Sequence, residues 1–573
     1  MLTIALPTVL TLCAPQEPKA ATQLITLQHI CTHEVNQTGL PWGSLLQCHD
    51  NLNKDLLLRN DAIGAITPTM ISDVLQDHTH KEIDAGRLLL QTVNSNLLMI
   101  GEPQLVTQVS NYVTEATNIL ARPMQVELCV WDATGTSACS SLLNKEAFAD
   151  FTANRTPMMR AVSTANAGDP LVIQNMTWSN YVRSIGVEVA QKQAMSRPET
   201  DHFGEGCSAM VRAYSLVGSS DFAVHMQFAA GKQHAPTKPL HTGLPSAPDI
   251  ELPHIASYFG TCSGRITNGG ALATTLKGSA VSGGQITITL RIISTDSPTA
   301  LSDKRAALLP IGALISEGLN HQVALPNVHS EDFTQRDPAL MCKEAAFKQK
   351  NAFGVIPPDQ LEDLATIVLA ATNDGDNHQM MIEGGYIFIR ASEQGCQRVK
   401  AMIQALQDDL IRNVEIHHSA SLHAPTGEAS GNTVHPVLHS LTLPTLLGRE
   451  ASAYRLLESN IAANIEIQIA SEAGTLEPIM HLQQSGTWFR ARTAPVGQGL
   501  HASLELLSVI APTPATRSVM PGGGVLMPAQ TSSARRNHDG ILTDVATIDH
   551  GDGPPVTLSG QDYRSKLSTT FSH

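Results

Sequence analysis

Two stretches of the chain that lie far apart share one pattern of apolar and polar positions. Val187–Gly206 reads VEVAQKQAMSRPETDHFGEG and Ile467–Gly486 reads IQIASEAGTLEPIMHLQQSG. Each opens with the two-residue alternation of a β-strand and continues to a proline and, eight residues later, a glycine. Only one Ala, the Pro and the last Gly are identical. The likeness is therefore one of pattern, and it raises the hypothesis that the chain holds two copies of one module.

The passage before the first stretch predicts helices and strands in alternation. A helix begins at Met70, and Leu88–Val93 with Asn96–Ile100 predicts a hairpin of two strands. After Pro103, which suits the first turn of a helix, apolar residues recur at spacings of three and four. Met124–Val130 then predicts a further strand.

The passage before the second stretch predicts the same order of elements. A helix around Leu364 is followed by a hairpin at Met380–Ile389, whose central Gly-Gly pair suits a tight turn. A second amphipathic helix runs from Cys396 to Leu410, and a strand follows at Asn413–Ser419.

Strands are also predicted at matching places in the two β-rich passages. Ala223–Phe228 corresponds to Ala502–Leu507, and Gly264–Gly278 corresponds to Ala546–Gly560. Any two β-rich stretches can be aligned by chance, and each pair has few identities. Six matched elements in one order, with similar gaps, instead favour a tandem duplication joined near the polar stretch Ser297–Lys304.

Prolines and glycines at matching places predict turns, because Gly adopts positive φ and Pro fixes φ near −65°. An arginine follows two of these glycines by six residues, at Arg212 and Arg492. The residues predicted as structural turn residues are Pro198, Gly206, Gly269, Gly270, Pro478, Gly486, Gly551 and Gly553.

The order of elements is similar to that of the secretin superfamily, the ring-forming outer-membrane gates of bacterial secretion and pilus systems. In Leu97–Leu128 a strand, a turn and an amphipathic helix lead into another strand, which resembles the small ring-building domains of secretins. Glu251–Leu276 resembles the end of the secretin β-domain, with a Pro-containing segment and a Gly-rich turn. Leu441–Tyr454 and Ala546–Gly560 resemble pieces of the same domain. Secretins carry one such β-domain per chain, whereas this sequence carries two.

The resemblance implies the α+β fold class, with two tandem modules, each a small α+β ring-building-type domain followed by a β-rich secretin-like domain. A candidate leader segment precedes them, because Leu2–Ala14 is mostly apolar, although it lacks a basic start and a buried strand is the alternative. The implied order is a leader at 1–22, the first α+β domain at 23–122, the first β-rich domain at 123–296, a linker at 297–306, the second α+β domain at 307–411 and the second β-rich domain at 412–573.

Composition and charge narrow the function classes. The 573 residues predict several domains, and 42% apolar with 16% charged residues is typical of a globular chain. The net charge of −15 argues against nucleic acid as a partner, because no basic stripe is present to displace phosphate counterions. Nine cysteines without a CxxC pair argue against a zinc ribbon and a thioredoxin-type site.

No motif predicts catalysis, a cofactor or a metal. GTCSGRIT at Gly260–Thr267 lacks the Gly-Lys-Ser/Thr of a phosphate loop, and no GxSxG elbow exists. The cluster His417, His418 and His423 suggests a metal site, but surface or interface histidines are the preferred interpretation. We therefore predict a non-enzymatic protein with no catalytic residue, no cofactor and no metal.

The function expected from these features is that of a structural, secretin-like envelope protein that forms or lines an oligomeric ring or pore for macromolecule transport. We expect a homo-oligomer in the periplasm or outer membrane of a Gram-negative-type bacterium, with other envelope or secretion proteins as partners. Two alternatives stay open. One is a soluble periplasmic or surface scaffold or binding protein with the same fold and no pore, and the other is an enzyme with a dispersed His/Ser site.

Overall fold

The computed structural model describes most of the chain between residues 20 and 572. The described residues are 20–27, 45, 68–93, 96–120, 122–133, 140–190, 193–240, 249–278, 284–294, 301–316, 355–372, 378–423, 437–470, 473–496, 499–510, 518–519, 525–526, 532–542, 548–549, 556–558 and 561–572. Most of the candidate leader, together with Gly551 and Gly553, lies outside these residues.

The described residues lie mostly in strands, so the α+β class predicted from the sequence is wrong and the protein is mainly β. The reason is the length of the strands. β7 (Leu171–Ala190), β8 (Gln193–Ser215), β18 (Glu450–Ala470) and β19 (Ala473–Val496) each hold 20 residues or more. Prolines, glycines and interrupted alternation inside them predict turns and short strands, although tertiary pairing keeps each strand continuous.

A first helical unit lies near the N-terminus. It has three strands in the order β1-β3-β2 with two helices packed on one face. Its elements are β1 (Ala21–Thr26), α1 (Pro68–Asp84), β2 (Leu88–Val93), β3 (Asn96–Gly101) and α2 (Pro103–Leu120). The hairpin and the helix after Pro103 therefore form where the hydrophobic periodicity predicts them.

A second helical unit has the same arrangement. Its three strands have the order β13-β15-β14, and Ser392 caps α7 by accepting a hydrogen bond from the Gly395 amide at 3.0 Å. Its elements are β13 (Ala306–Pro310), α4 (Gly312–Ile315), α6 (Pro358–Ala370), β14 (Gln379–Glu383), β15 (Tyr386–Arg390) and α7 (Glu393–Leu410).

The rest of the described chain forms two sheets packed face to face. The eight-stranded sheet has the order β23-β20-β19-β18-β10-β9-β8-β7, and the ten-stranded sheet has the order β24-β26-β16-β17-β11-β12-β4-β6, with β25 and β5 added at its side. Further elements are β4 (Pro123–Asp132), β5 (Leu142–Leu143), α3 (Lys145–Thr152), β6 (Met159–Asn166), β9 (Phe222–Leu240), β10 (Ile250–Ile266), β11 (Ala271–Gly278), β12 (Ile286–Ser294), β16 (Asn413–His423), β17 (Val437–Leu446), β20 (Gly499–Ile510), β23 (Ser532–Leu542), β24 (Ile548–Asp549), β25 (Val556–Leu558) and β26 (Gln561–Ser572). The short strands β21 (Ser518–Val519) and β22 (Val525–Leu526) pair with each other.

One hydrophobic core fills the space between these sheets. It includes inward-facing side chains of both halves of the chain, such as Leu128 and Phe228 from the first and Leu443 and Phe489 from the second. Because a β-sandwich core needs apolar side chains from two facing sheets, the two halves are stabilised together by this shared core.

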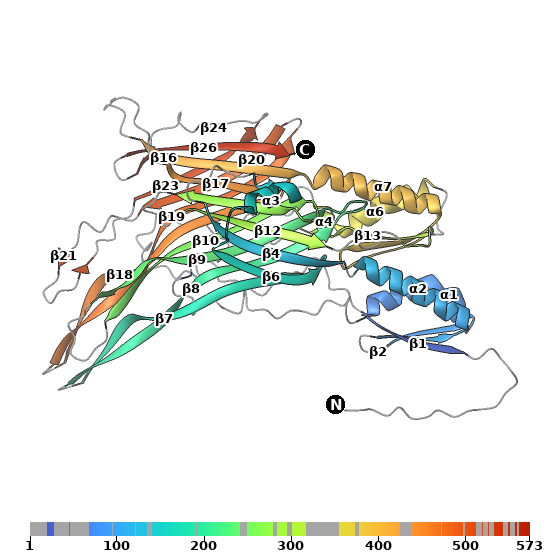
Figure 1. Ribbon diagram of the computed structural model, residues 1–573, viewed down its shortest axis with the longest axis horizontal. Coiled ribbons are helices and arrows are strands. Elements are labelled where there is room, and N and C mark those ends of the chain that lie inside the picture. Colours follow the sequence, from blue (N-terminus) through green and yellow to red (C-terminus); the bar gives the residue numbers. More distant parts are fainter. Residues whose placement is uncertain are drawn as a thin grey trace.

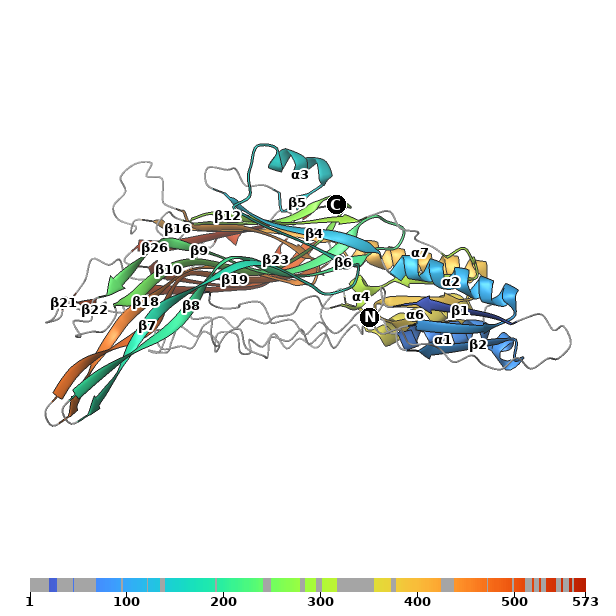
Figure 2. The same cartoon turned by 60° about the horizontal axis from the view of Figure 1, so that its bottom comes forward.

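The long strands extend beyond the sandwich as two hairpins. β7 and β8 stay paired as far as Ala190 and Gln193, whereas the pairing of β8 with β9 ends at Gly206. Figure 1 shows β7 and β18 projecting together on the side opposite the helical units, and the turned view in Figure 2 agrees. The molecule is therefore elongated, with the helical units at one end and the projecting hairpins at the other.

Candidate functional site

The two halves of the chain meet along paired strands, which we call the module joint. In the eight-stranded sheet β10 pairs antiparallel with β18, from His254 opposite Ser459 to Thr261 opposite Ser452. In the ten-stranded sheet β11 pairs with β17, where Gly278 lies opposite His439. The joint therefore consists of backbone ladders in both layers of the sandwich.

A single transverse row of residues crosses the joint in the eight-stranded sheet. Neighbours in this row are opposite one another in the strand register. The row reads Gln174, Ser208, Ala229, Phe259, Tyr454, Trp488, Leu507 and Arg535. Its first four members come from the first half and its last four from the second, in the same strand order.

A buried carboxylate lies on the outer face of this joint. Glu458 of β18 is fully buried and accepts hydrogen bonds from the Ser257 hydroxyl at 2.5 Å and from the Leu45 amide at 2.8 Å. The Leu45 carbonyl accepts from the Gly204 amide at 2.9 Å. A buried charge is tolerated only when its lone pairs are satisfied, so this carboxylate of the second half depends on donors from the first half.

A buried guanidinium lies on the inner face of the joint. Arg455 of β18 donates to the Gly284 carbonyl at 3.0 Å through Nη2 and at 3.3 Å through Nε. Burial lowers the pKa of Arg455 from its usual value, and the neighbouring Tyr258 hydroxyl opposes that effect. A Cβ at Gly278 would overlap the Arg455 guanidinium, so a side chain there would displace that group from its present position.

Two stacked histidines extend this inner polar cluster. Nε2 of His439 lies 3.1 Å from Nδ1 of His418, and the rings are stacked with an interplanar angle of 18°. Nδ1 of His439 lies 3.1 Å from the Thr487 hydroxyl. Burial, with the charges of His418 and Arg455, holds the pKa of His439 well below its usual value. His439 is therefore neutral at physiological pH.

A third polar contact crosses the joint on the outside of the ten-stranded sheet. The Glu415 carboxylate accepts hydrogen bonds from the hydroxyl and amide of Ser141 in the first half, and it lies 2.6 Å from Nε2 of His417. Burial raises the pKa of Glu415, but the hydrogen bonds from His417 and Ser141 outweigh it and lower that pKa. The hydrogen bonds from Ser141 therefore link the two halves, while His417 contacts the same carboxylate from its own strand.

The helical units also meet, through an apolar contact. The inward side of the β13-β15-β14 sheet packs on its own helices, while its other side, with Leu308 and Phe388, joins the core of the first helical unit. A cavity of about 70 Å³ at this contact is lined by Leu75 and Ala116 from α1 and α2 and by Phe388. The helices of the first unit therefore cover the sheet of the second.

The structure places four of the predicted turn residues inside strands. Pro198 and Gly206 lie in β8, and Pro478 and Gly486 lie in β19. Both glycines have positive φ, +136° and +144°, where pairing to the next strand ends. Their role is to let the hairpins diverge from the sheet. Both prolines lie in the projecting hairpins, where β8 and β19 pair on one side only among the described residues.

Gly269 and Gly270 lie in the turn between β10 and β11. Gly269 has φ +84°, and the Gly270 amide donates to the Thr267 carbonyl at 2.9 Å, which closes the turn between β10 and β11.

The matched arginines Arg212 and Arg492 make the same kind of contact in the two halves. Nε of Arg212 donates to the Gly168 carbonyl at 2.9 Å, and Nε of Arg492 donates to the Gly448 carbonyl at 3.1 Å.

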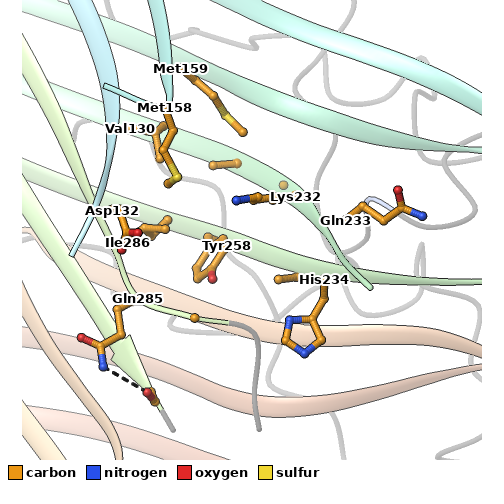
Figure 3. Close-up of a pocket in the computed structure, with 15 residues that line it drawn as sticks. Val130, Asp132, Met158, Met159, Lys232, Gln233, His234, Tyr258, Gln285 and Ile286 are labelled. Carbon is orange, nitrogen blue, oxygen red and sulfur yellow. Dashed lines mark hydrogen bonds between the residues drawn. The ribbon is translucent and has the colours of Figure 1, made fainter. Parts of the chain in front are cut away.

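A cavity of about 340 Å³ opens between the two sheets of the first half. Figure 3 shows Met158 and Met159 on one side and Tyr258 below, with Lys232 and His234 at the rim. Apolar walls with a mixed polar rim match no particular ligand class.

Among the described residues no group of three His, Cys, Asp or Glu side chains is placed to hold a metal ion. Within the same residues, no helix is both long enough and apolar enough to cross a membrane.

The residues of the joint carried no signal in the sequence. Arg455, Glu458 and His439 are single polar residues within alternating strands, a pattern that predicts a solvent-facing side. The one available signal is the cluster around His417 and His418, which favours surface or interface histidines. The structure places both on β16, beside His439 and Glu415, the residues that contact the first half.

Comparison with known proteins gives only distant matches. No protein-family model and no curated protein matches the chain. The type IV competence pilus secretin PilQ of V. cholerae is 12% identical, and the match covers 36% of this chain and 73% of PilQ with a TM-score of 0.16. ExeD of Aeromonas hydrophila is 7% identical, and the match covers 96% of this chain and 89% of ExeD with a TM-score of 0.16. The resemblance to secretins is thus supported as a distant similarity, and one this weak carries no structural argument.

Proposed function

We propose that this chain is a secretin-like envelope protein whose copies join head to tail into a ring that passes macromolecules. One observation carries the proposal: the chain joins, between its own halves, the same kind of strand edges that stay unpaired among the described residues at the two ends of the eight-stranded sheet. β10 ends the four-strand run of the first half, and β18 begins that of the second. The outer strands β7 and β23 occupy the corresponding places.

The correspondence of the halves supports a tandem duplication. Gly206 and Gly486 lie 280 residues apart, and so do the carbonyl acceptors Gly168 and Gly448 of the matched arginines. Register shifts in β7 and β18, after Val182 and after Ala462, have the same separation. A constant separation across a hairpin, a turn and an irregularity is what two copies of one module produce.

The physics of sheet edges favours assembly. Among the described residues, no strand pairs with the outer side of β7 or of β23. An unpaired edge is a template for another strand, and two different edges that fit each other make a head-to-tail contact. Repetition of such a contact closes into a ring when the rotation per chain divides a full turn.

The ten-stranded sheet carries the same signal. Its outer strand β6 occupies the place that β17 has in the second half, because each lies beside the first strand, β4 or β16. Val162 of β6 lies opposite Glu127 as Thr442 of β17 lies opposite His417. Val162 is exposed, whereas Thr442 is buried at the module joint. Val162 is therefore an exposed apolar residue at a position that a contact like the module joint would bury.

The projecting hairpins supply the part of such a ring that would meet the cargo. Each half contributes one, and Gly206 or Gly486 sets its divergence from the sheet. Two hairpins per chain would line the passage, and the shared core would build the wall. Placement in the envelope rests on the resemblance of the element order to secretins.

Electron microscopy of the full-length purified chain tests this function. We expect closed rings in which each chain contributes two repeated densities, in preparations that need detergent and resist heat. A monodisperse monomer, with or without detergent, would overturn the proposal and favour the soluble scaffold. Rings that form without detergent would support the assembly and reject membrane insertion.

A further inference from the structure

The first helical unit leaves one face of its sheet uncovered. Leu24 of β1 is 59% exposed, and Leu89 and Val93 of β2 are 50% and 42% exposed. Leu24 lies opposite Leu98 of β3 and Leu89 lies opposite Ile100, so these side chains share one face. The opposite face is buried against α1 and α2. Three exposed apolar side chains on one sheet face form a patch, unlike scattered single exposures.

The corresponding face of the second helical unit is buried within the chain. Phe388 of β15 follows Leu98 by 290 residues, and Leu308 lies opposite Phe388 as Leu24 lies opposite Leu98. Leu308 is thus the counterpart of Leu24. Leu308 and Phe388 are both buried against the first helical unit. The counterpart of the open face therefore shows what covers such a face: a pair of helices from a neighbouring unit.

The second helical unit offers such a pair of helices to solvent. Leu364 and Ile367 of α6 are 40% and 66% exposed. On α7, Met402 and Leu406 are partly exposed, and they follow Tyr112 and Ala116 of α2 by 290 residues. Tyr112 and Ala116 line the contact with the sheet of the second unit. The chain thus exposes an apolar sheet face on its first helical unit. On its second helical unit it exposes helices of the kind that cover such a face within the chain.

We infer that the open face of the first helical unit, around Leu24 and Leu89, binds the α6–α7 side of the second helical unit in another copy of this chain. The contact repeats the one inside the chain and points in the same head-to-tail direction. It deepens the ring proposed above by naming the partner surface of the helical units, and it rests on that assembly.

One polar link of the internal contact has no counterpart between chains. The Glu115 carboxylate of α2 accepts a hydrogen bond from the Ser302 amide at 2.9 Å. The residue 290 positions later is Ala405, which offers no acceptor on its side chain. The contact between chains therefore lacks this hydrogen bond, and we expect it to be weaker than the internal one.

Photo-cross-linking of the full-length chain tests this inference. A benzoylphenylalanine at position 89, in an equal mixture of ¹⁵N-labelled and unlabelled chains, should form mixed-isotope products that map to residues 358–410. The same probe at the exposed Asp84 at the end of α1 is the matched control and should not give that product. Products from position 89 that map elsewhere, or that never mix isotopes in an assembled sample, would overturn the inference. A wild-type sample with no assembly at all would instead reject the ring itself.

The introduction of a negative charge on each apolar surface gives a second readout. Leu89→Asp and Ile367→Asp change exposed residues, so folding should be unaffected. Each should make the assembled protein at least tenfold more prone to dissociate on dilution, while Met195→Asp, equally exposed on β8, should have no effect. The strand-edge contacts between chains are unchanged in these variants, so rings should still form but should dissociate more readily. Unchanged dissociation in both variants refutes the docking surface and leaves the strand-edge ring standing.

Discussion

Phe259 of β10 lies directly opposite Tyr454 of β18, and both side chains are buried. This pair joins the two halves of the chain in the middle of the eight-stranded sheet. The residues at the ends of the same transverse row are Gln174 and Arg535, which occupy the places of Tyr454 and Phe259 in their own halves. The internal pair therefore defines, residue by residue, the contact that two chains would make.

Gly206 and Gly486, the positive-φ glycines of the two projecting hairpins, should be intolerant of any side chain. In Gly206→Ala the new Cβ would overlap the Asn175 carbonyl, and in Gly486→Ala it would overlap the Arg455 carbonyl. Backbone strain of this type costs about 1–3 kcal/mol per site. We expect each variant to lower the free energy of unfolding by at least that amount in urea denaturation.

Gly186→Ala is the matched control for these glycines. Gly186 lies in the same hairpin, and a Cβ there would meet Glu199 only at an ordinary 3.5 Å. Its stability should stay near that of the wild type. Equal losses at Gly186 and Gly206 would show that the hairpin is generally fragile and that the glycine geometry is not the cause.

The buried carboxylate of the module joint should be sensitive to truncation. Glu458→Ala removes the acceptor of the Ser257 hydroxyl and the Leu45 amide, which leaves two buried donors unsatisfied. Each such donor costs about 1–3 kcal/mol. Thermal unfolding should show a clear loss of stability, with a smaller loss for Glu458→Gln, which keeps an acceptor. Glu188→Ala, at an exposed position on β7, should be neutral.

Acid should destabilise the joint through His439. His439 faces His418 from β16, Arg455 from β18, Thr487 from β19 and Gly278 of β11. Since its pKa is lowered in the folded protein, the unfolded chain binds the proton more readily below about pH 6.5. Stability is full above that pH and falls as the pH decreases toward the folded pKa.

The variant His439→Gln isolates this effect. Wild-type stability should fall by up to about 1.4 kcal/mol per pH unit from this group between pH 6 and pH 4. The variant should lack that part of the slope, although His225, whose pKa burial lowers to about 3, keeps its own contribution in both proteins. Parallel curves for the two proteins would mean that His439 is not the group responsible.

The sequence predicted the local elements better than the long-range ones. Hydrophobic periodicity placed the strands at Leu88–Val93 and Asn96–Ile100 and the helix after Pro103, because such elements bury one face against their immediate neighbours. The long strand β8 was missed, because Pro198 and Gly206 predict breaks when only local propensity is considered. Pairing with β7 from Gln193 to Val211 overrides that propensity.

The buried polar residues of the module joint could not be predicted from the sequence for a related reason. Arg455 and Glu458 lie on alternate faces of β18, and polar residues in a strand ordinarily face water. Their burial follows from the pairing of β10 with β18, which are separated by nearly 200 residues of sequence. By contrast, the matched spacing of Pro198 and Gly206 with Pro478 and Gly486 was visible, since a repeat leaves its mark directly in the sequence.

Cross-linking of Gln174→Cys with Arg535→Cys tests the central claim most directly. These positions end the transverse row, so a head-to-tail contact that copies the pairing of Phe259 with Tyr454 brings them opposite each other, about 5 Å apart between Cβ atoms. In the assembled double variant, a short bis-maleimide should give a ladder of covalent multimers, absent from the wild type and from each single variant. A double variant that assembles as the wild type does, yet yields only monomers on a denaturing gel, would contradict the account.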